Sequence, residues 1–63
     1  MNLIKVKNKK RTLGYYICEK LGEIQITTAK QSAPKFNTKK SVTTIKWLSW
    51  NYPEFKFKIE KLF

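Results

Sequence analysis

The chain has 63 residues, enough for one small domain and too few for a large core. Fourteen Lys and Arg residues against four acidic ones give a net charge of +10, which favours an anionic partner. A single cysteine, Cys18, and the lack of histidine exclude an internal disulfide and the usual zinc sites. The apolar runs are too short for a bilayer span or a signal peptide, so we expect a cytoplasmic protein without a membrane segment. We also expect no metal and no cofactor.

Three strands are predicted in the first half of the chain. Residues 2–7 alternate between apolar and charged side chains, the pattern of a strand with one solvated face. A second strand is predicted over 13–19, which is rich in aromatic and β-branched residues. After a tight turn at Leu21 and Gly22, residues 23–29 alternate again. This order predicts a three-stranded antiparallel meander.

A helix and a final strand are predicted in the second half. A loop leads to Phe36, the expected anchor on the core, and Thr38 is the expected N-cap of a helix over about 39–51. Pro53 is predicted to end the helix, and residues 54–61 alternate as a last strand. The apolar residues at helical spacing predict a buried stripe of Val42, Ile45, Leu48 and Tyr52.

The element order β-β-β-α-β predicts an α+β fold in which residues 1–63 form a single domain. Each strand has one apolar face, so the helix is expected to cover one face of the sheet. The edge that the last strand joins stays open.

The residues of common enzyme sites are missing from the chain. Without histidine there is no usual general base, and two glycines cannot form a phosphate-binding glycine loop. Glu19 and Glu23 flank one turn, where they are expected to be solvated charges or partners of neighbouring lysines. Cys18 is expected to be a small packed or half-exposed thiol within a strand, not a nucleophile. We therefore expect a protein that is not an enzyme.

Lysines on the outer faces of the first and last strands form the main candidate site. A sheet with one lysine-rich face can lie against a phosphate backbone. Thirteen of the fourteen basic residues are lysine, which suits phosphate better than base edges. The same lysines could instead protect a solvated face against aggregation or reflect AT-rich coding. The candidate nucleic-acid contacts are Lys5, Lys7, Lys9, Lys10, Arg11, Lys56 and Lys58, with Lys39 and Lys40 at the helix start as a second cluster.

Two pairs of aromatic residues are further candidates. Tyr15 and Tyr16 are neighbours in a strand and point to opposite faces, so one is expected in the core and the other beside the lysines, where it can stack on a base. Trp47 and Trp50 fall outside the predicted helix stripe. They are expected to be exposed, as a protein interface or a self-association surface. The alternative packs Trp50 over the sheet edge and Trp47 on a lysine stem.

The segment Phe36-Asn37-Thr38-Lys39-Lys40, the helix after it and Tyr52-Pro53 resemble a pattern in small bacteriophage and mobile-element proteins. Residues 13–53 are also similar to the arm-binding N-terminal domain of tyrosine integrases. In that family a three-stranded sheet with a packed helix binds DNA through the sheet, and the Phe-x-Thr-Lys-Lys segment caps the helix. This chain departs from it in its last strand, its few arginines and glycines and its lack of a catalytic domain. The resemblance therefore implies a stand-alone accessory protein.

Two functional hypotheses follow. The leading one is a nucleic-acid-binding accessory protein, with DNA as the expected ligand, that binds mainly by charge. The alternative is an inhibitor or adaptor that binds an acidic host protein through Trp47 and Trp50, with the lysines speeding association. A third is a structural subunit of a larger assembly. DNA against RNA, sequence specificity, the identity of a protein partner and a homodimeric state stay open.

Overall fold

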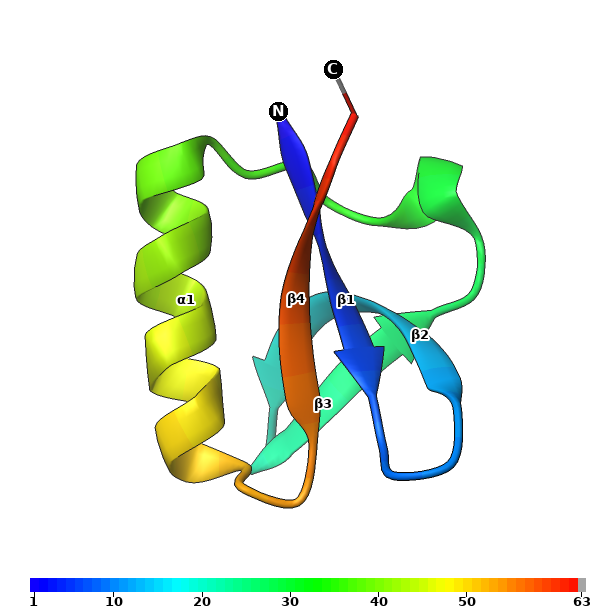
Figure 1. Cartoon of the computed structure of the whole chain (residues 1–63), viewed down its shortest axis with the longest axis vertical. Coiled ribbons are helices and arrows are strands. Elements are labelled where there is room, and N and C mark those ends of the chain that lie inside the picture. Colours follow the sequence, from blue (N-terminus) through cyan, green and yellow to red (C-terminus); the bar gives the residue numbers. More distant parts are fainter. Residues whose placement is uncertain (63) are drawn as a thin grey trace.

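Four strands and one helix make up the fold in a computed structural model that describes residues 1–62. The helix lies against one face of the sheet, which confirms the predicted α+β fold class (Figure 1). A short 3₁₀ turn, η1, lies between β3 and α1 in the chain. The elements are β1 (Asn2–Lys7), β2 (Thr12–Lys20), β3 (Glu23–Thr27), η1 (Lys30–Ser32), α1 (Thr38–Asn51) and β4 (Lys56–Lys61). The third and fourth strands are shorter than the predicted 23–29 and 54–61.

The sheet has the order β3-β2-β1-β4, and all neighbouring strands are antiparallel. The first three strands form the predicted antiparallel meander, and the last strand joins its free edge at β1, with pairs from Asn2↔Lys61 to Lys7↔Lys56. This pairing places β1 inside the sheet, where it is hydrogen-bonded to β2 along one edge and to β4 along the other.

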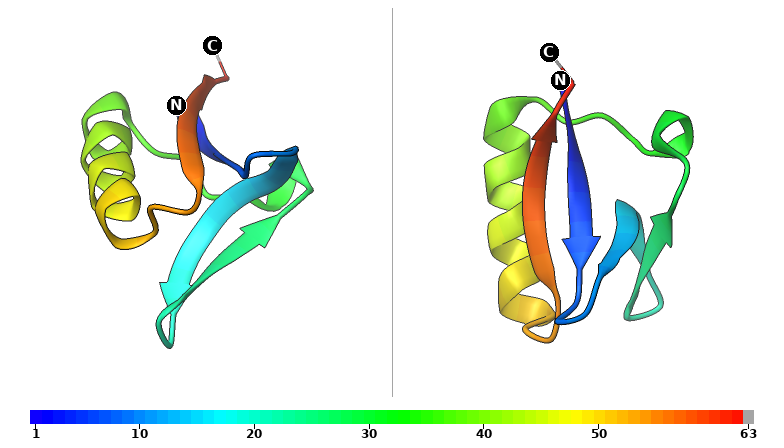
Figure 2. Two further views of the ribbon diagram at one scale, coloured as in Figure 1. Left: turned by 60° about the horizontal axis from the view of Figure 1, so that its bottom comes forward. Right: turned by 45° about the vertical axis from the view of Figure 1, so that its right-hand side comes forward.

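The hairpin of β2 and β3 swings away from the other two strands (Figure 2). The register of β2 against β1 shifts at Leu13, which lies between the partners of Val6 and Lys7. Such a bulge bends a strand and increases its twist. Only the start of β2 therefore pairs with β1, and its second half pairs with β3 alone.

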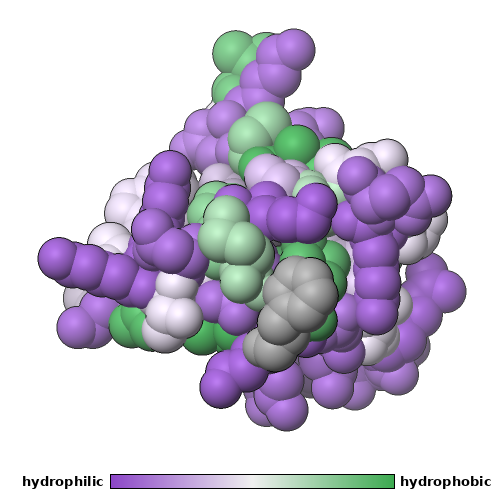
Figure 3. All heavy atoms as spheres, turned by 90° about the horizontal axis from the view of Figure 1, so that it is seen from above, coloured by the Kyte–Doolittle hydropathy of each residue, from purple (hydrophilic) through white to green (hydrophobic). Residues whose placement is uncertain are grey.

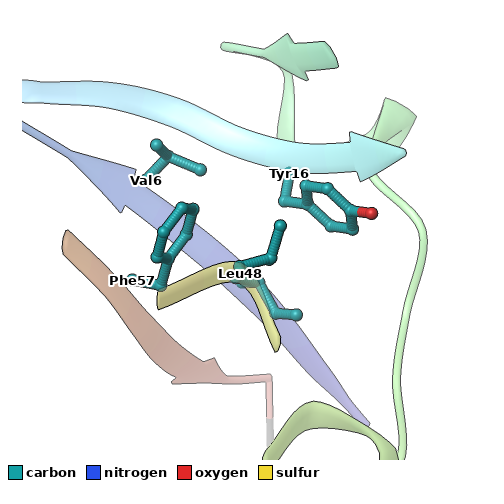
Figure 4. Close-up of a cluster of buried hydrophobic side chains, with 5 residues drawn as sticks. Val6, Tyr16, Leu48 and Phe57 are labelled. Atoms are coloured by element: carbon teal, nitrogen blue, oxygen red, sulfur yellow. The ribbon is translucent and has the colours of Figure 1, made fainter. Parts of the chain in front are cut away.

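The main core lies between α1 and the sheet. Leu48 of the helix is fully buried and points toward Val6, Phe57 and Tyr16 (Figure 4). Ile4 completes this cluster, and Phe36 packs against it from the loop before the helix, which confirms its expected role as an anchor. Paired backbone hydrogen bonds between Asn2 and Phe36, of 2.7 and 2.8 Å, hold that loop to the start of β1.

A second, smaller cluster covers part of the opposite sheet face. The segment that contains η1 passes over this face, and Ala33 packs there with Leu3 and Tyr15. Both Tyr15 and Tyr16 are buried, so the expectation of one tyrosine exposed beside the lysines is wrong. The strand alternation places them correctly on opposite faces, but it carries no sign that a loop will cover the second face.

The helix begins one residue earlier than predicted, and its buried stripe is shifted. Asn37 is the N-cap, because its Oδ1 accepts a hydrogen bond of 2.7 Å from the Lys40 amide. Val42 is 54% exposed, and Ser41 is fully buried in its place. The Ser41 hydroxyl donates to the Asn37 carbonyl at 2.8 Å and accepts from the Asn2 side chain at 3.4 Å. These polar contacts need a small hydroxyl residue facing β1, which an apolar periodicity does not reveal.

The end of the molecule that carries both termini is mostly hydrophilic (Figure 3). Seen from the end where both termini lie, polar side chains surround small apolar patches (Figure 3). Among the described residues 1–62, no helix has the length and hydrophobicity to cross a membrane.

Candidate nucleic-acid interface

The sheet face turned away from the helix carries two pairs of opposed lysines. In the register of β1 and β4, Lys5 lies opposite Lys58 and Lys7 lies opposite Lys56. Their strand neighbours Ile4, Val6 and Phe57 point the other way into the core, so alternation places all four lysines on the outer face. Like charges directly opposite each other destabilise an antiparallel pair.

The loop between β1 and β2 continues this basic surface. The Asn8 side-chain oxygen accepts hydrogen bonds from the amides of Lys10 and Arg11, at 2.8 and 2.9 Å. The Asn8 amide donates to the Arg11 carbonyl at 3.0 Å, which closes a tight turn. Within this turn the side chains of Lys9, Lys10 and Arg11 are all exposed. The structure thus joins the three predicted loop cations to the lysines of β1 and β4.

A hollow of about 430 Å³ lies where this loop meets the ends of β1 and β4. Five cationic side chains line it, and none of its described lining residues is acidic. The lining residues are Lys7, Asn8, Lys9, Lys10, Arg11, Thr12 and Lys56.

Glu60 bounds the basic surface at its other end. Its carboxylate pairs with Lys30 at 2.8 Å and Lys5 at 3.0 Å, and accepts a hydrogen bond from the Tyr15 hydroxyl at 3.3 Å. Hydrogen bonds from Lys30 and Lys5 lower the pKa of Glu60 from 4.5 to about 2. The same contact with Glu60 raises the pKa of Lys30. Lys5, a predicted nucleic-acid contact, is therefore already engaged by a carboxylate.

Sequence analysis missed both Glu60 and Lys30. Glu60 lies two residues after Lys58 in β4, so strand alternation was a usable signal for its place on the outer face. Lys30 gave no such signal, because η1 brings it to Glu60 from a loop.

The second predicted cluster, Lys39 and Lys40, lies away from the first. Both residues are exposed at the start of α1, and Lys40 lies 5.9 Å from the centre of the Phe36 ring. The helix starts at the end of the molecule where the termini lie, whereas the loop of residues 8–11 lies at the opposite end (Figure 1). The structure therefore does not bring the two predicted clusters together.

Acidic residues gather near the C-terminal end of the helix. The Tyr52 hydroxyl donates to the Gly22 carbonyl at 3.1 Å and so ties the β2–β3 turn to that end. Burial, followed by the charges of Glu19, Glu54 and Glu23, raises the pKa of Tyr52. In residues 1–62 no group of three or more carboxylate or thiol side chains could hold a metal ion.

Both tryptophans of α1 are exposed, as their positions outside the buried stripe predicted. Trp50 is 87% exposed, so it does not fold over the sheet edge. Trp47 is 46% exposed. Its ring makes an edge-to-face contact with the ring of Tyr52, with 6.3 Å between the ring centres. A shallow hollow beside Trp50 is lined by Val42, Ile45, Lys46 and Ser49.

No family model matches the chain, and comparisons with curated proteins and with solved structures give no significant match. The resemblance to the arm-binding domain of tyrosine integrases therefore stays a prediction.

Proposed function

We propose that the protein binds nucleic acid, with DNA as the expected ligand, through the lysine face of β1 and β4. The single observation that carries this proposal is the pair of opposed lysine pairs, Lys5↔Lys58 and Lys7↔Lys56, on an outer sheet face. Glu60 offsets the charge of Lys5, but the repulsion between Lys7 and Lys56 costs stability in the free protein, and phosphates lying along the strands would remove it.

The kind of basic residue supports binding to the backbone rather than to bases. Lysine presents a compact charge that suits phosphate, whereas specific base contacts depend more on the planar fork of arginine. Arg11 is the only arginine in the chain. With Tyr15 buried, no described aromatic side chain of this face is left to stack on a base. Binding with little sequence preference follows, as expected of an accessory protein of phage or mobile-element type.

A salt titration tests the proposal. Affinity for a mixed-sequence duplex should fall with salt at a log–log slope of about −0.9 for each phosphate neutralised. Six cations of the proposed surface lie outside the Glu60 ion pairs, and a phosphate for each would give a slope of about −5. They are Lys7, Lys9, Lys10, Arg11, Lys56 and Lys58. No detectable binding at about 50 mM salt would overturn the proposal.

A pair of charge reversals locates the interface. Lys56→Glu with Lys58→Glu should abolish binding, because both residues are exposed on the proposed face. Lys39→Glu with Lys40→Glu makes the same change in net charge at the start of the helix, which lies elsewhere. This matched control should keep most of the affinity. If both double variants lose equal affinity, overall charge and not the lysine face carries the binding. Melting curves establish that each variant folds.

A second candidate function is the inhibitor or adaptor of an acidic host protein. The observation that favours it is Trp50, which is almost fully exposed beside a partly apolar hollow on α1. Exposed tryptophans are frequent anchors of protein interfaces, so Trp50→Ala should cost about 2 kcal/mol or more of such binding. It should leave nucleic-acid binding unchanged, because α1 covers the opposite sheet face. A pull-down from host lysate with and without nuclease separates the two candidates.

A further inference from the structure

The hollow beside the loop of residues 8–11 differs in shape from the rest of the basic surface. On β1 and β4 the lysines form rows, whereas here five cations surround one concavity of about 430 Å³. Water occupies about 30 Å³ per molecule in the liquid, so this space is ample for a phosphate group and its sugar. Where the strands end, this geometry can hold one compact, highly charged group.

The side chains of this loop are its main donors to a ligand. The amides of Lys10 and Arg11 already donate to the Asn8 side chain. An anion in the hollow would therefore be held by the ammonium groups and by the Arg11 guanidinium. That guanidinium can donate two parallel hydrogen bonds to one phosphate, which is the strongest geometry for this pair.

The charge of the hollow indicates which phosphate it would hold. A phosphodiester inside a strand carries one negative charge, whereas a phosphate monoester carries about −1.5 to −2 at neutral pH and has three free oxygens. Five cations lining one hollow favour the more highly charged group, because each additional unit of charge interacts with all of them. We propose that this hollow binds the terminal phosphate of a nucleic-acid strand, an inference that rests on the proposed function.

Matched oligonucleotides test this inference. Fluorescence anisotropy should be measured with one strand that ends in a 5′-phosphate, a 3′-phosphate or only hydroxyl groups. At least one phosphorylated form should bind about tenfold more tightly than the hydroxyl form at pH 7.5, consistent with one charge-assisted contact. Because the second pKa of a phosphate monoester is about 6, the preference should shrink at pH 5.5.

Two substitutions separate this inference from the proposed function. Arg11→Gln should remove the preference for the phosphorylated end, and should weaken the hydroxyl form by about as much as Lys58→Gln does, because each change removes one cation. Lys58→Gln, outside the hollow, should weaken both forms equally and keep the preference. Equal affinity of the wild-type protein for all three strands would overturn the terminal-phosphate inference and leave the proposed function standing. Absence of binding to any of them and to the mixed-sequence duplex would overturn both.

Discussion

Along β1, one face holds Asn2, Ile4 and Val6 beneath the helix, and the other holds Leu3, Lys5 and Lys7. The first face is covered over its whole length. The second is covered only at Leu3, where the segment through η1 packs, and becomes a row of lysines toward the loop of residues 8–11. Burial of the first face stabilises the fold, whereas the like charges of Lys7 and Lys56 on the second face cost stability.

Glu60 lies at the boundary between the two parts of that second face. It is opposite Leu3 in the register, and its carboxylate reaches both Lys5 and the Tyr15 hydroxyl. The covered part therefore ends in an ion-pair cluster, and the uncovered part begins beyond it. One alternating strand can thus serve both a core and a proposed binding surface, because loops, and not only helices, decide which positions are covered.

The largest effect is expected from the helix-covered face. Leu48→Ala should cost about 2–5 kcal/mol of unfolding free energy, because the side chain is fully buried in the main cluster. Val42→Ala, on the same helix but exposed, is the matched control and should change stability by no more than about 0.5 kcal/mol. Denaturant unfolding measures both, and equal losses would show that the packing of α1 is wrong.

A smaller effect is expected from the loop-covered part. Leu3→Ala should cost about 2 kcal/mol, near the low end for a buried leucine, because its cluster contains fewer buried residues than the main core. Unfolding curves for Leu3→Ala and Leu48→Ala under identical conditions test the order. If Leu3→Ala proved the more damaging change, the far face would have to be counted as the principal core.

Acid should loosen the boundary between the two parts. The pKa of Glu60 is about 2 in the folded protein and near 4.5 without its partners, so its ion pairs stabilise the fold at pH values above about 4.5. This contribution is lost as the pH falls from about 4.5 to 2. Over this range the unfolded chain, in which Glu60 has the higher pKa, binds a proton that the folded protein does not, so acid favours unfolding. Melting temperatures across this range should decline, and Glu60→Gln should flatten the decline. A Glu60→Gln profile identical to that of the wild type would contradict the assignment.

The smallest effect sharpens the contrast between stability and binding. Lys7→Glu turns the opposed pair with Lys56 from like to unlike charges, so stability should rise by about 0.2–1 kcal/mol. Nucleic-acid affinity should fall in the same variant, because a cation of the hollow is lost. Reversing Lys56 as well restores like charges and should remove the gain. If Lys7→Glu were less stable than the wild type and bound nucleic acid equally well, Lys7 and Lys56 would not belong to the proposed binding site.

Local pattern was enough to predict much of this fold. The alternation over residues 2–7 gave the observed bounds of β1, and the outward direction of Lys56 and Lys58 followed from the inward Phe57. Which of these faces would be buried by segments distant in the sequence was not predictable in this way. The contact of Ser41 with Asn2 and the burial of Tyr15 depend on segments far apart in the sequence. The ion pairs of Glu60 likewise depend on where η1 comes to lie.

The placement of β1 between β2 and β4 has a consequence for the time course of folding. One edge of β1 stays unpaired until β4, residues 56–61, is present. The helix α1 packs across both β1 and β4. Closing so long a loop is entropically costly, and sheets built on distant pairs fold more slowly than those built on local hairpins. During synthesis, the first strand made would wait with one edge unpaired until the last strand emerged. The β2–β3 hairpin, by contrast, can close as soon as its own turn is complete.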